Sequence, residues 1–274
     1  MIEIKAYKMD GLGNDFVIID GRKNKISLNK EQILNISDRK KGPGCDQVIL
    51  VEKDKEKKTN AKITFYNSDG GEIYACGNGS RCVSYFLMNE KKLIKSKINT
   101  KSGVLTAKLK SAFEISVDMG KPNFDWKKIP LSHEMNHKKI IISVKNFKNL
   151  HGYALSVGNP HIIFFKNITI ENLKKIGPLI ENYHYFPERC NVTFAEKIGK
   201  NDISVKVWER GAGLTQACGT AACATMVAAN KLGLCKKKVN IHFKNGTLQI
   251  EWMPNKNIIM TGSVSQIRSI SLKI

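Results

Sequence analysis

The chain has 274 residues, of which 42% are apolar and seven are proline, and its formal net charge is +21 at pH 7. This length suits two domains that each bury a core, and the composition excludes a disordered chain. The lysines are spread along the chain without a helix-turn-helix, zinc-finger or aromatic RNA-binding motif beside them. A solvated basic surface is therefore favoured over a nucleic-acid-binding protein, although a cationic field would still steer small anions.

Short alternating runs dominate the chain and predict β-strands. In chain order the strands are expected over residues 2–9, 16–20, 48–52, 61–66, 104–109, 113–118, 140–144, 161–165, 192–195 and 203–208. Residues 239–252 predict a hairpin that turns at Asn245-Gly246. The first run lacks the apolar core of a signal peptide, and no segment is long enough to span a membrane.

Four helices are expected, over residues 30–39, 78–90, 170–181 and 220–232. The second and the fourth are apolar on almost every face, which is typical of buried helices. Between residues 121 and 139 the periodicity fails and turn residues cluster. We therefore predict an α+β fold of two domains, residues 1–122 and 123–263, each a mostly antiparallel curved sheet or barrel wrapped around a central helix.

The sequence contains an internal duplication. Residues 63–78 align without a gap on residues 205–220, and each segment carries Ala-Cys-Gly, around Cys76 and Cys218. The pair Gly13-Asn14 matches Gly158-Asn159, and residues 46–48 match residues 190–192, in the same order and at nearly the same offset. This pattern predicts two pseudo-symmetric domains. A ligand between them would meet one cysteine from each side.

Each duplicated cysteine stands just before a predicted helix, where free N–H groups and the positive end of the helix dipole lie. Such a position is expected to lower the pKa of a thiol and to bind a carboxylate. Two facing sites of this kind suit removal of a proton from one face of a carbon next to a carboxylate and its return to the other face. The prediction is stereoinversion by a thiolate and a thiol.

Other uses of the cysteines are less well supported. Seven cysteines are an odd number, which fits reduced thiols in a cytoplasmic protein better than a disulfide framework. Cys76 and Cys82, like Cys218 and Cys223, would point to different helix faces and could not share a zinc ion, so no metal is predicted.

Three further residues have a structural and a functional reading. His161 follows a duplicated loop, and a core histidine and a functional one are equally favoured. Glu209 and Arg210 replace the Asn67 and Ser68 of the first copy. They are either a solvated charged pair, or Arg210 binds a second carboxylate of the ligand through two parallel N–H donors.

Residues 9–16, 67–81, 158–161 and 209–223 resemble the signature segments of the diaminopimelate epimerase family in order and spacing. The resemblance implies a cofactor-independent cytoplasmic isomerase that interconverts LL- and meso-diaminopimelate for lysine and peptidoglycan synthesis. Cys76 and Cys218 would be the acid/base pair, and His161 and Glu209 would tune the thiols. The implied substrate contacts are Asn14, Gln47, Asn67, Gly77, Asn78, Asn159, Asn191, Glu209, Arg210, Gly219 and Thr220.

The resemblance also implies that residues 264–274 return to the first domain, and it leaves a monomer and a homodimer open as the working form. Arg268 stands about where some relatives have an aromatic dimer contact, so the mode of dimerisation would differ. The alternative is a proline racemase or hydroxyproline epimerase of the same fold. Because proline has no second charged group, Asn67, Asn191 and Arg210 would then have nothing to bind.

Overall fold

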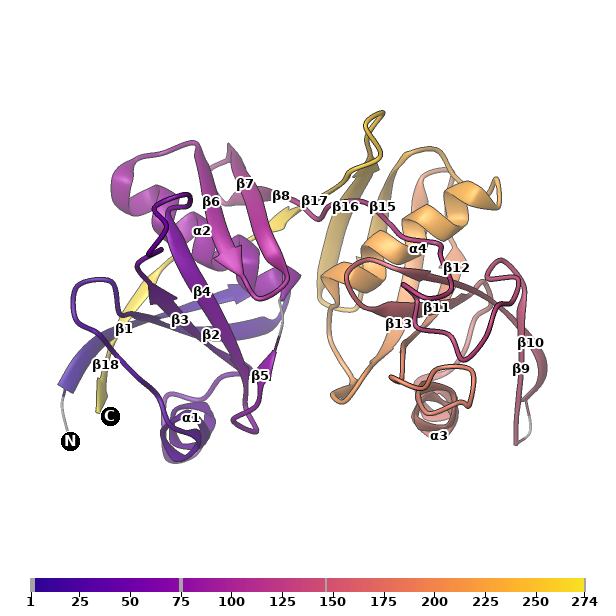
Figure 1. Cartoon of the computed structure of the whole chain (residues 1–274), viewed down its shortest axis with the longest axis horizontal. Coiled ribbons are helices and arrows are strands. Elements are labelled where there is room, and N and C mark those ends of the chain that lie inside the picture. Colours follow the sequence, from indigo (N-terminus) through magenta and orange to yellow (C-terminus); the bar gives the residue numbers. More distant parts are fainter. Residues whose placement is uncertain (1–2, 74–75, 146, 274) are drawn as a thin grey trace. The chain divides into compact units, whose positions relative to one another are not determined.

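The computed structural model describes residues 3–73, 76–145 and 147–273, which divide into two compact units (Figure 1). The first unit is Met1–Asp118 together with Thr261–Ile274, and the second is Met119–Met260. The boundaries expected from the sequence were 122/123 and 263/264. The chain passes between the units twice, after Asp118 and after Met260. Near these two places the Met119 N–H donates to Ile258 O at 2.9 Å and the Ile258 N–H donates to Gly120 O at 2.8 Å, and all three residues belong to the second unit.

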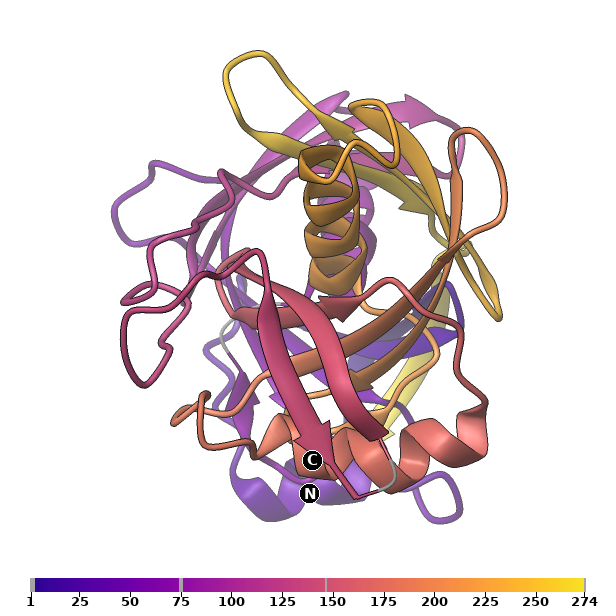
Figure 2. The same cartoon turned by 90° about the vertical axis from the view of Figure 1, so that its right-hand side faces the viewer.

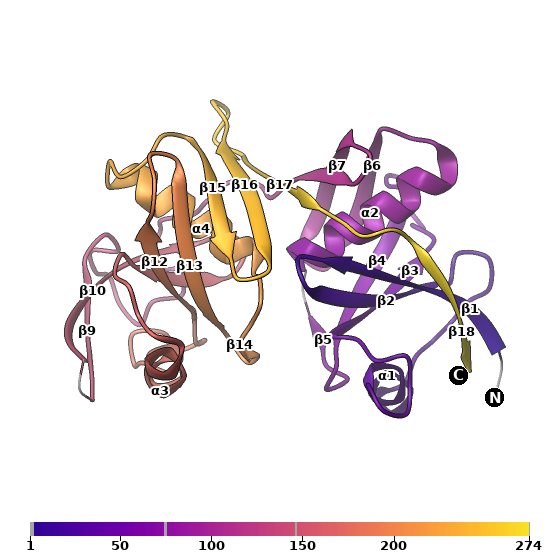
Figure 3. The same ribbon diagram turned by 180° about the vertical axis from the view of Figure 1, so that it is seen from behind.

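The first unit is a curved sheet with two helices. Its strands are β1 (Glu3–Gly11), β2 (Asn14–Asp20), β3 (Gln47–Glu52), β4 (Ala61–Asn67), β5 (Glu72–Ile73), β6 (Lys95–Thr100), β7 (Gly103–Ser111), β8 (Glu114–Asp118) and β18 (Arg268–Lys273). They pair in the order β18-β1-β2-β3-β4-β6-β7-β8, with β5 on β4. Within the residues described for this unit, only β2–β3 and β4–β6 are parallel. Figure 3 shows β18 running beside β1.

The second unit repeats this arrangement. Its strands are β9 (Ile140–Val144), β10 (Phe147–Ser156), β11 (Pro160–Phe164), β12 (Asn191–Lys197), β13 (Asp202–Glu209), β14 (Gly213–Leu214), β15 (Lys238–Phe243) and β16 (Gly246–Trp252), and β17 (Ile258–Ser263) spans the second crossing. Here β11–β12 and β13–β15 are the parallel pairs. They follow the same succession of elements as β2–β3 and β4–β6, so the topology confirms the duplication.

Each unit has a helix on either face of its sheet. In the first unit α1 (Lys30–Ser37) packs Ile33 and Ile36 against Val17 and Val48 on one face, and α2 (Gly77–Lys91) covers the other. In the second unit α3 (Ile170–Glu181) and α4 (Gly219–Lys231) take the same places. Figure 2 shows α4 running through the middle of its curved sheet. These layers confirm the α+β class; in the described residues each sheet is open rather than a closed barrel.

All four predicted helices are present to within two residues at each end. Their position in the core follows from their sequence, because α4 buries a series of small residues that let the strands approach closely: Ala221, Ala222, Ala224, Ala228 and Ala229. Several strands were not predicted, among them β6, β10 and β18. The final hairpin pairs Phe243 with Gly246, so its turn lies at Lys244-Asn245, one residue earlier than predicted.

Candidate active site

Both duplicated cysteines occupy the N-cap position of the helix that runs through their unit, and of the two only the Cys76 side chain makes a capping hydrogen bond in the described residues. Cys76 is the N-cap of α2, with φ −133° and ψ 118°, and Cys218 is the N-cap of α4, with φ −130° and ψ 113°. The helices begin at the next residues, Gly77 and Gly219. The first-turn N–H groups and the positive end of each helix dipole therefore lie beside a sulfur.

In the first unit three predicted residues form one cluster. The Cys76 thiol accepts a hydrogen bond from the Gly79 N–H at 3.4 Å and donates to Asn14 Oδ1 at 3.7 Å. Asn78 Nδ2 donates to the same Asn14 oxygen at 3.5 Å. Asn14, the first residue of β2, thus connects the turn between β1 and β2 to the first turn of α2.

Two more predicted residues face each other across the sheet. The register sets Phe16 opposite Gln47 and Gln47 opposite Asn67, and Gln47 Nε2 donates to Asn67 Oδ1 at 3.1 Å. We call Asn14, Gln47, Asn67, Cys76 and Asn78 the first half-site.

In the second unit the three corresponding strand positions carry different side chains. His161 lies opposite Asn191, and the pairing of Val192 with Trp208 sets Asn191 next to Glu209. By register His161 therefore stands where the first unit has Phe16, and Glu209 stands where it has Asn67. We call Asn159, His161, Asn191, Glu209, Arg210, Cys218 and Thr220 the second half-site.

Cys218 is 5% exposed and lies 3.5 Å from Thr220 Oγ1. Burial raises the pKa of the Cys218 thiol well above its usual value, and the Glu209 carboxylate raises it further, against the lowering effect of hydrogen bonds from Thr220 and from the Ala221 backbone. The expectation that the helix start lowers the pKa is wrong for Cys218, because burial and the neighbouring negative charge outweigh the dipole.

Glu209 is the charged partner of that thiol. Although part of the residue is exposed, burial of its carboxyl raises the pKa of Glu209, while the neighbouring Thr215 hydroxyl and Cys218 thiol act in the opposite direction. Because the pKa of the Cys218 thiol lies well above its usual value, Cys218 rests as a thiol beside this carboxyl group.

His161 is completely buried. Its Nε2 lies 2.9 Å from Asn159 Oδ1, which can only accept, so Nε2 carries the proton. Burial lowers the pKa of His161 to about 3, with a contribution from the charge of Arg210. The ring is therefore neutral near pH 7, and Nδ1 is an acceptor with no hydrogen-bond partner among the residues described.

Arg210 is anchored through its backbone and its side chain. Its N–H donates to Asn191 Oδ1 at 3.0 Å, and Asn191 Nδ2 donates to Pro160 O at 3.0 Å. The guanidinium donates to Glu188 O at 3.0 Å. Asn191 therefore contacts Arg210 through a hydrogen bond and lies opposite His161 on the neighbouring strand.

Sequence reasoning missed three residues that hold these clusters. Asp46 accepts from Asn14 Nδ2, Thr215 lies beside Glu209, and Glu181 accepts from the Trp208 indole and the Gly211 N–H on either side of Glu209-Arg210. Asp46 could have been found, because it opens the duplicated segment 46–48. Glu181 lies in a predicted amphipathic helix and gave no signal.

Among the described residues, no group of three or more histidines, cysteines and acids is placed to hold a metal ion. No helix in the same residues is long and apolar enough to cross a bilayer.

The comparisons with known proteins agree with the sequence motifs. The sequence model of the family described as diaminopimelate epimerase matches residues 6–125 and 153–267. The chain is 49% identical to the diaminopimelate epimerase of Pelagibacter ubique, with all of both chains covered. It is 41% identical to that of Caulobacter vibrioides over 94% of this chain and 93% of the relative.

Solved structures of lower identity share the fold. A hydroxyproline epimerase from Agrobacterium vitis superposes with a TM-score of 0.68 at 11% identity, over 99% of this chain and 93% of that one. A Bacillus anthracis phenazine biosynthesis protein gives 0.67 at 16% identity, with both chains covered completely. On the evidence of its signature segments and its full-length relatives, the chain belongs to the diaminopimelate epimerase family.

Proposed function

We propose that this chain converts LL-2,6-diaminopimelate to meso-diaminopimelate without a cofactor, in the synthesis of lysine and peptidoglycan precursors, with Cys76 and Cys218 as its two bases. The observation that carries the proposal is the matched pair of cysteine N-caps on the two buried helices. Full-length similarity to diaminopimelate epimerases supports the choice of substrate.

The reaction needs one thiolate and one thiol. The thiolate takes the α-proton from one face of the carbon and becomes a thiol, and the other thiol gives its proton to the opposite face and becomes a thiolate. No atom is gained or lost, and the two sulfurs exchange protonation states. The pair therefore titrates as a coupled unit.

The helix starts supply the electrostatic stabilisation. When the α-proton leaves, negative charge develops on the substrate carboxylate, and preorganised N–H donors lower the energy of that state. We assign this role to the first turns of α2 and α4, through Gly77, Asn78, Gly219 and Thr220.

Glu209 and His161 set the protonation state of the second half-site. Glu209 takes the proton of Cys218 when that sulfur must act as the base, which offsets the high cost of an isolated buried thiolate. His161 stays neutral, so it adds no positive charge, and its Nδ1 can accept a hydrogen bond from a substrate ammonium group.

The remaining polar residues distinguish diaminopimelate from a shorter amino acid. We assign Asn67, Asn191 and Arg210 to the distal amino acid end of the substrate. The alternative, a proline racemase or hydroxyproline epimerase, leaves the distal group without a ligand. Likeness in fold to a hydroxyproline epimerase does not favour it, because at 11% identity only the fold is shared.

Solvent exchange tests the proposal. LL-diaminopimelate and L-proline are incubated separately with the protein in D₂O, under reducing conditions and with no cofactor added. Deuterium at the α-carbon with inversion on diaminopimelate alone is the expected result. Exchange on proline would instead assign the chain to the racemases, and exchange on neither would refute the proposed activity.

Single cysteine substitutions test the two-base mechanism. Cys76→Ala and Cys218→Ala should each lower epimerisation by at least about 10³-fold, because neither variant can move protons on both faces. Cys235→Ala is the matched control, since this half-buried thiol belongs to neither half-site. Turnover near that of the unmodified chain in either of the first two variants would contradict the mechanism.

A homodimer, which the family resemblance leaves open, belongs to the same proposal. Light scattering during size-exclusion chromatography should give a mass near twice 30.7 kDa. A mass near 30.7 kDa in an active preparation would refute it.

A further inference from the structure

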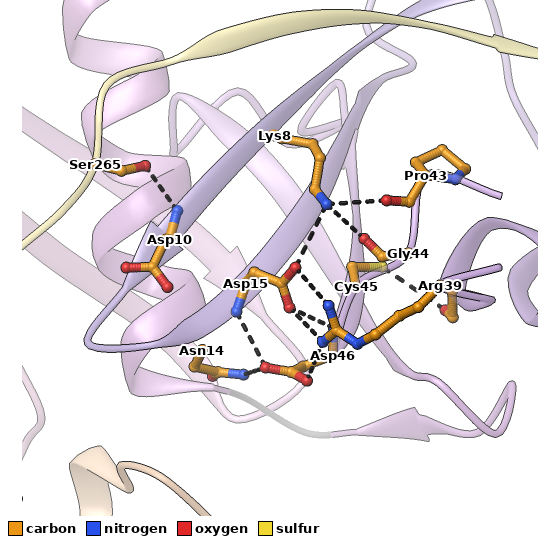
Figure 4. A network of polar contacts seen from close by, with 11 residues as sticks. Lys8, Asp10, Asn14, Asp15, Arg39, Pro43, Gly44, Cys45, Asp46 and Ser265 are labelled. Carbon is orange, nitrogen blue, oxygen red and sulfur yellow. Dashed lines mark hydrogen bonds and ion pairs between the residues drawn. The ribbon is translucent and has the colours of Figure 1, made fainter. Parts of the chain in front are cut away.

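The first half-site includes a carboxylate that the proposed reaction does not use. Asp46 Oδ2 accepts hydrogen bonds from Asn14 Nδ2 at 2.9 Å and from the Asp15 N–H at 3.1 Å. Its other oxygen accepts from Arg39 Nη2 at 2.7 Å. Figure 4 shows Asp46 lying between Asn14 and Arg39. The carboxylate is therefore held on both sides and cannot turn freely.

This contact decides which end of the Asn14 amide faces the cysteine. A carboxylate only accepts, so the Asn14 nitrogen must point to Asp46 and the oxygen must point away from it. That oxygen lies 3.7 Å from Cys76 Sγ and 3.5 Å from Asn78 Nδ2. Both distances are long, whereas the contact to Asp46 is 2.9 Å, so Asp46 makes the strongest of the three contacts.

The orientation matters because an amide oxygen and an amide N–H have opposite effects on a thiol. The oxygen accepts from S–H and favours the protonated form, whereas an N–H would donate to the thiolate and favour the charged form. We propose that Asp46 is a positioning residue that keeps the Asn14 oxygen on Cys76, and thereby keeps Cys76 as a thiol until substrate binds. The inference rests on the proposed function for its catalytic meaning.

Other charged and titratable groups lie near the same turn and remain in every variant considered below. Arg81 and Cys82 follow on α2 and are completely buried, and Asp10 stands at the end of β1. Asp15 is paired with Arg39 and with Lys8. None of these groups accepts from the Asn14 amide nitrogen in the described contacts, so none duplicates the role of Asp46.

Two substitutions separate orientation from charge. Asp46→Ala removes both the charge and the acceptor, and frees the Asn14 amide to turn its N–H toward the sulfur. Asp46→Asn removes the same charge but keeps a side-chain oxygen, which the N–H groups of Asn14 and Asp15 hold in place. The difference between the two variants therefore measures the acceptor alone.

The readout is the alkylation of Cys76 by iodoacetamide between pH 5 and pH 10, followed by mass spectrometry of the peptide that contains it. One hydrogen bond to a charged group is worth roughly one to two powers of ten in an equilibrium constant. The alkylation rate at pH 7 should rise at least about tenfold in Asp46→Ala, with a lower pH midpoint, and should stay within about threefold in Asp46→Asn. Cys235 reports in the same digest and should not change.

Two results would overturn the proposal: equal rates in the unmodified chain and Asp46→Ala, or an equal rise in Asp46→Asn, which would make the effect one of charge. If the peptides of buried Cys45 and Cys82 also become reactive, the alanine variant has lost its fold, and Asp46→Leu, which fills the volume without accepting, replaces it. The assay does not depend on turnover. A chain that fails to epimerise diaminopimelate refutes the proposed function and leaves this result standing.

Discussion

The buried imidazole of His161 makes the stability of the second unit depend on pH. The pKa is 6.5 in an ordinary environment and about 3 in the fold, because burial disfavours the charged ring. A histidine whose pKa is lowered by folding contributes stability that is complete above pH 6.5 and is lost as the pH falls from there toward 3. Between pH 7 and pH 5 the free energy of unfolding should therefore fall by about 2 kcal/mol from this residue alone.

The duplicated register supplies the variant that tests this value. His161 stands where the first unit has the completely buried Phe16, so His161→Phe places in the second unit the residue that the first unit uses. Phenylalanine does not titrate. The variant should lose about 2 kcal/mol less than the unmodified chain between pH 7 and pH 5, whatever its stability at pH 7.

Urea unfolding followed by tryptophan fluorescence suits the measurement, because Trp126, Trp208 and Trp252 all lie in the second unit. Other groups that titrate in this range cancel in the difference between the two chains. His151→Phe, at an exposed position on β10, is the matched control and should keep the dependence of the unmodified chain. Equal pH dependence in His161→Phe and the unmodified chain would refute the reasoning.

Two further substitutions test the electrostatics of Cys218 and the packing of α3 against β13. Glu209→Gln should lower kcat by about 10²-fold or more and raise the alkylation rate of Cys218 at pH 7, because a proton acceptor and a like charge are lost together; an unchanged alkylation profile would exclude the electrostatic coupling. Gly177→Ala places a Cβ 2.7 Å from the Trp208 ring, so overpacking of about 1–3 kcal/mol should exceed the gain of about 1 kcal/mol in helix propensity and lower the free energy of unfolding in urea. A more stable alanine variant would show that Trp208 can move aside.

The sequence predicted the features that have a strong local signal. The helices around Cys76 and Cys218 were found because their apolar residues cover nearly every face, and the cores of β2, β3 and β4 because Val, Ile and Phe alternate or run together there. The duplication then predicted that the elements of the second domain follow the same order as those of the first.

The missed strands lack that signal. β6 buries Ser96 and Thr100 on the same face as Ile98. Because this inward face is mostly polar, the sequence shows no alternation of apolar and polar residues that would predict a strand. The pKa of Cys218 was wrongly predicted for a related reason: a helix start is visible in the sequence, but the depth of the thiol and its proximity to Glu209 arise only when α4 packs against the sheet of the second unit.

The polar contacts account for how one duplicated motif can supply both an acid and a base. The backbone around the two cysteines is the same to within a few degrees, so the scaffold alone would give two sulfurs of equal chemistry. The neighbouring side chains differ: Cys76 donates to the neutral amide of Asn14, which cannot take a proton, whereas Cys218 lies beside the carboxylate of Glu209, which can. Both partners favour the thiol form of their sulfur in the free protein, and only Cys218 has a neighbour that can take up its proton during turnover. The asymmetry thus lies in residues that the duplication left free to diverge, and the backbone holds them in matching positions.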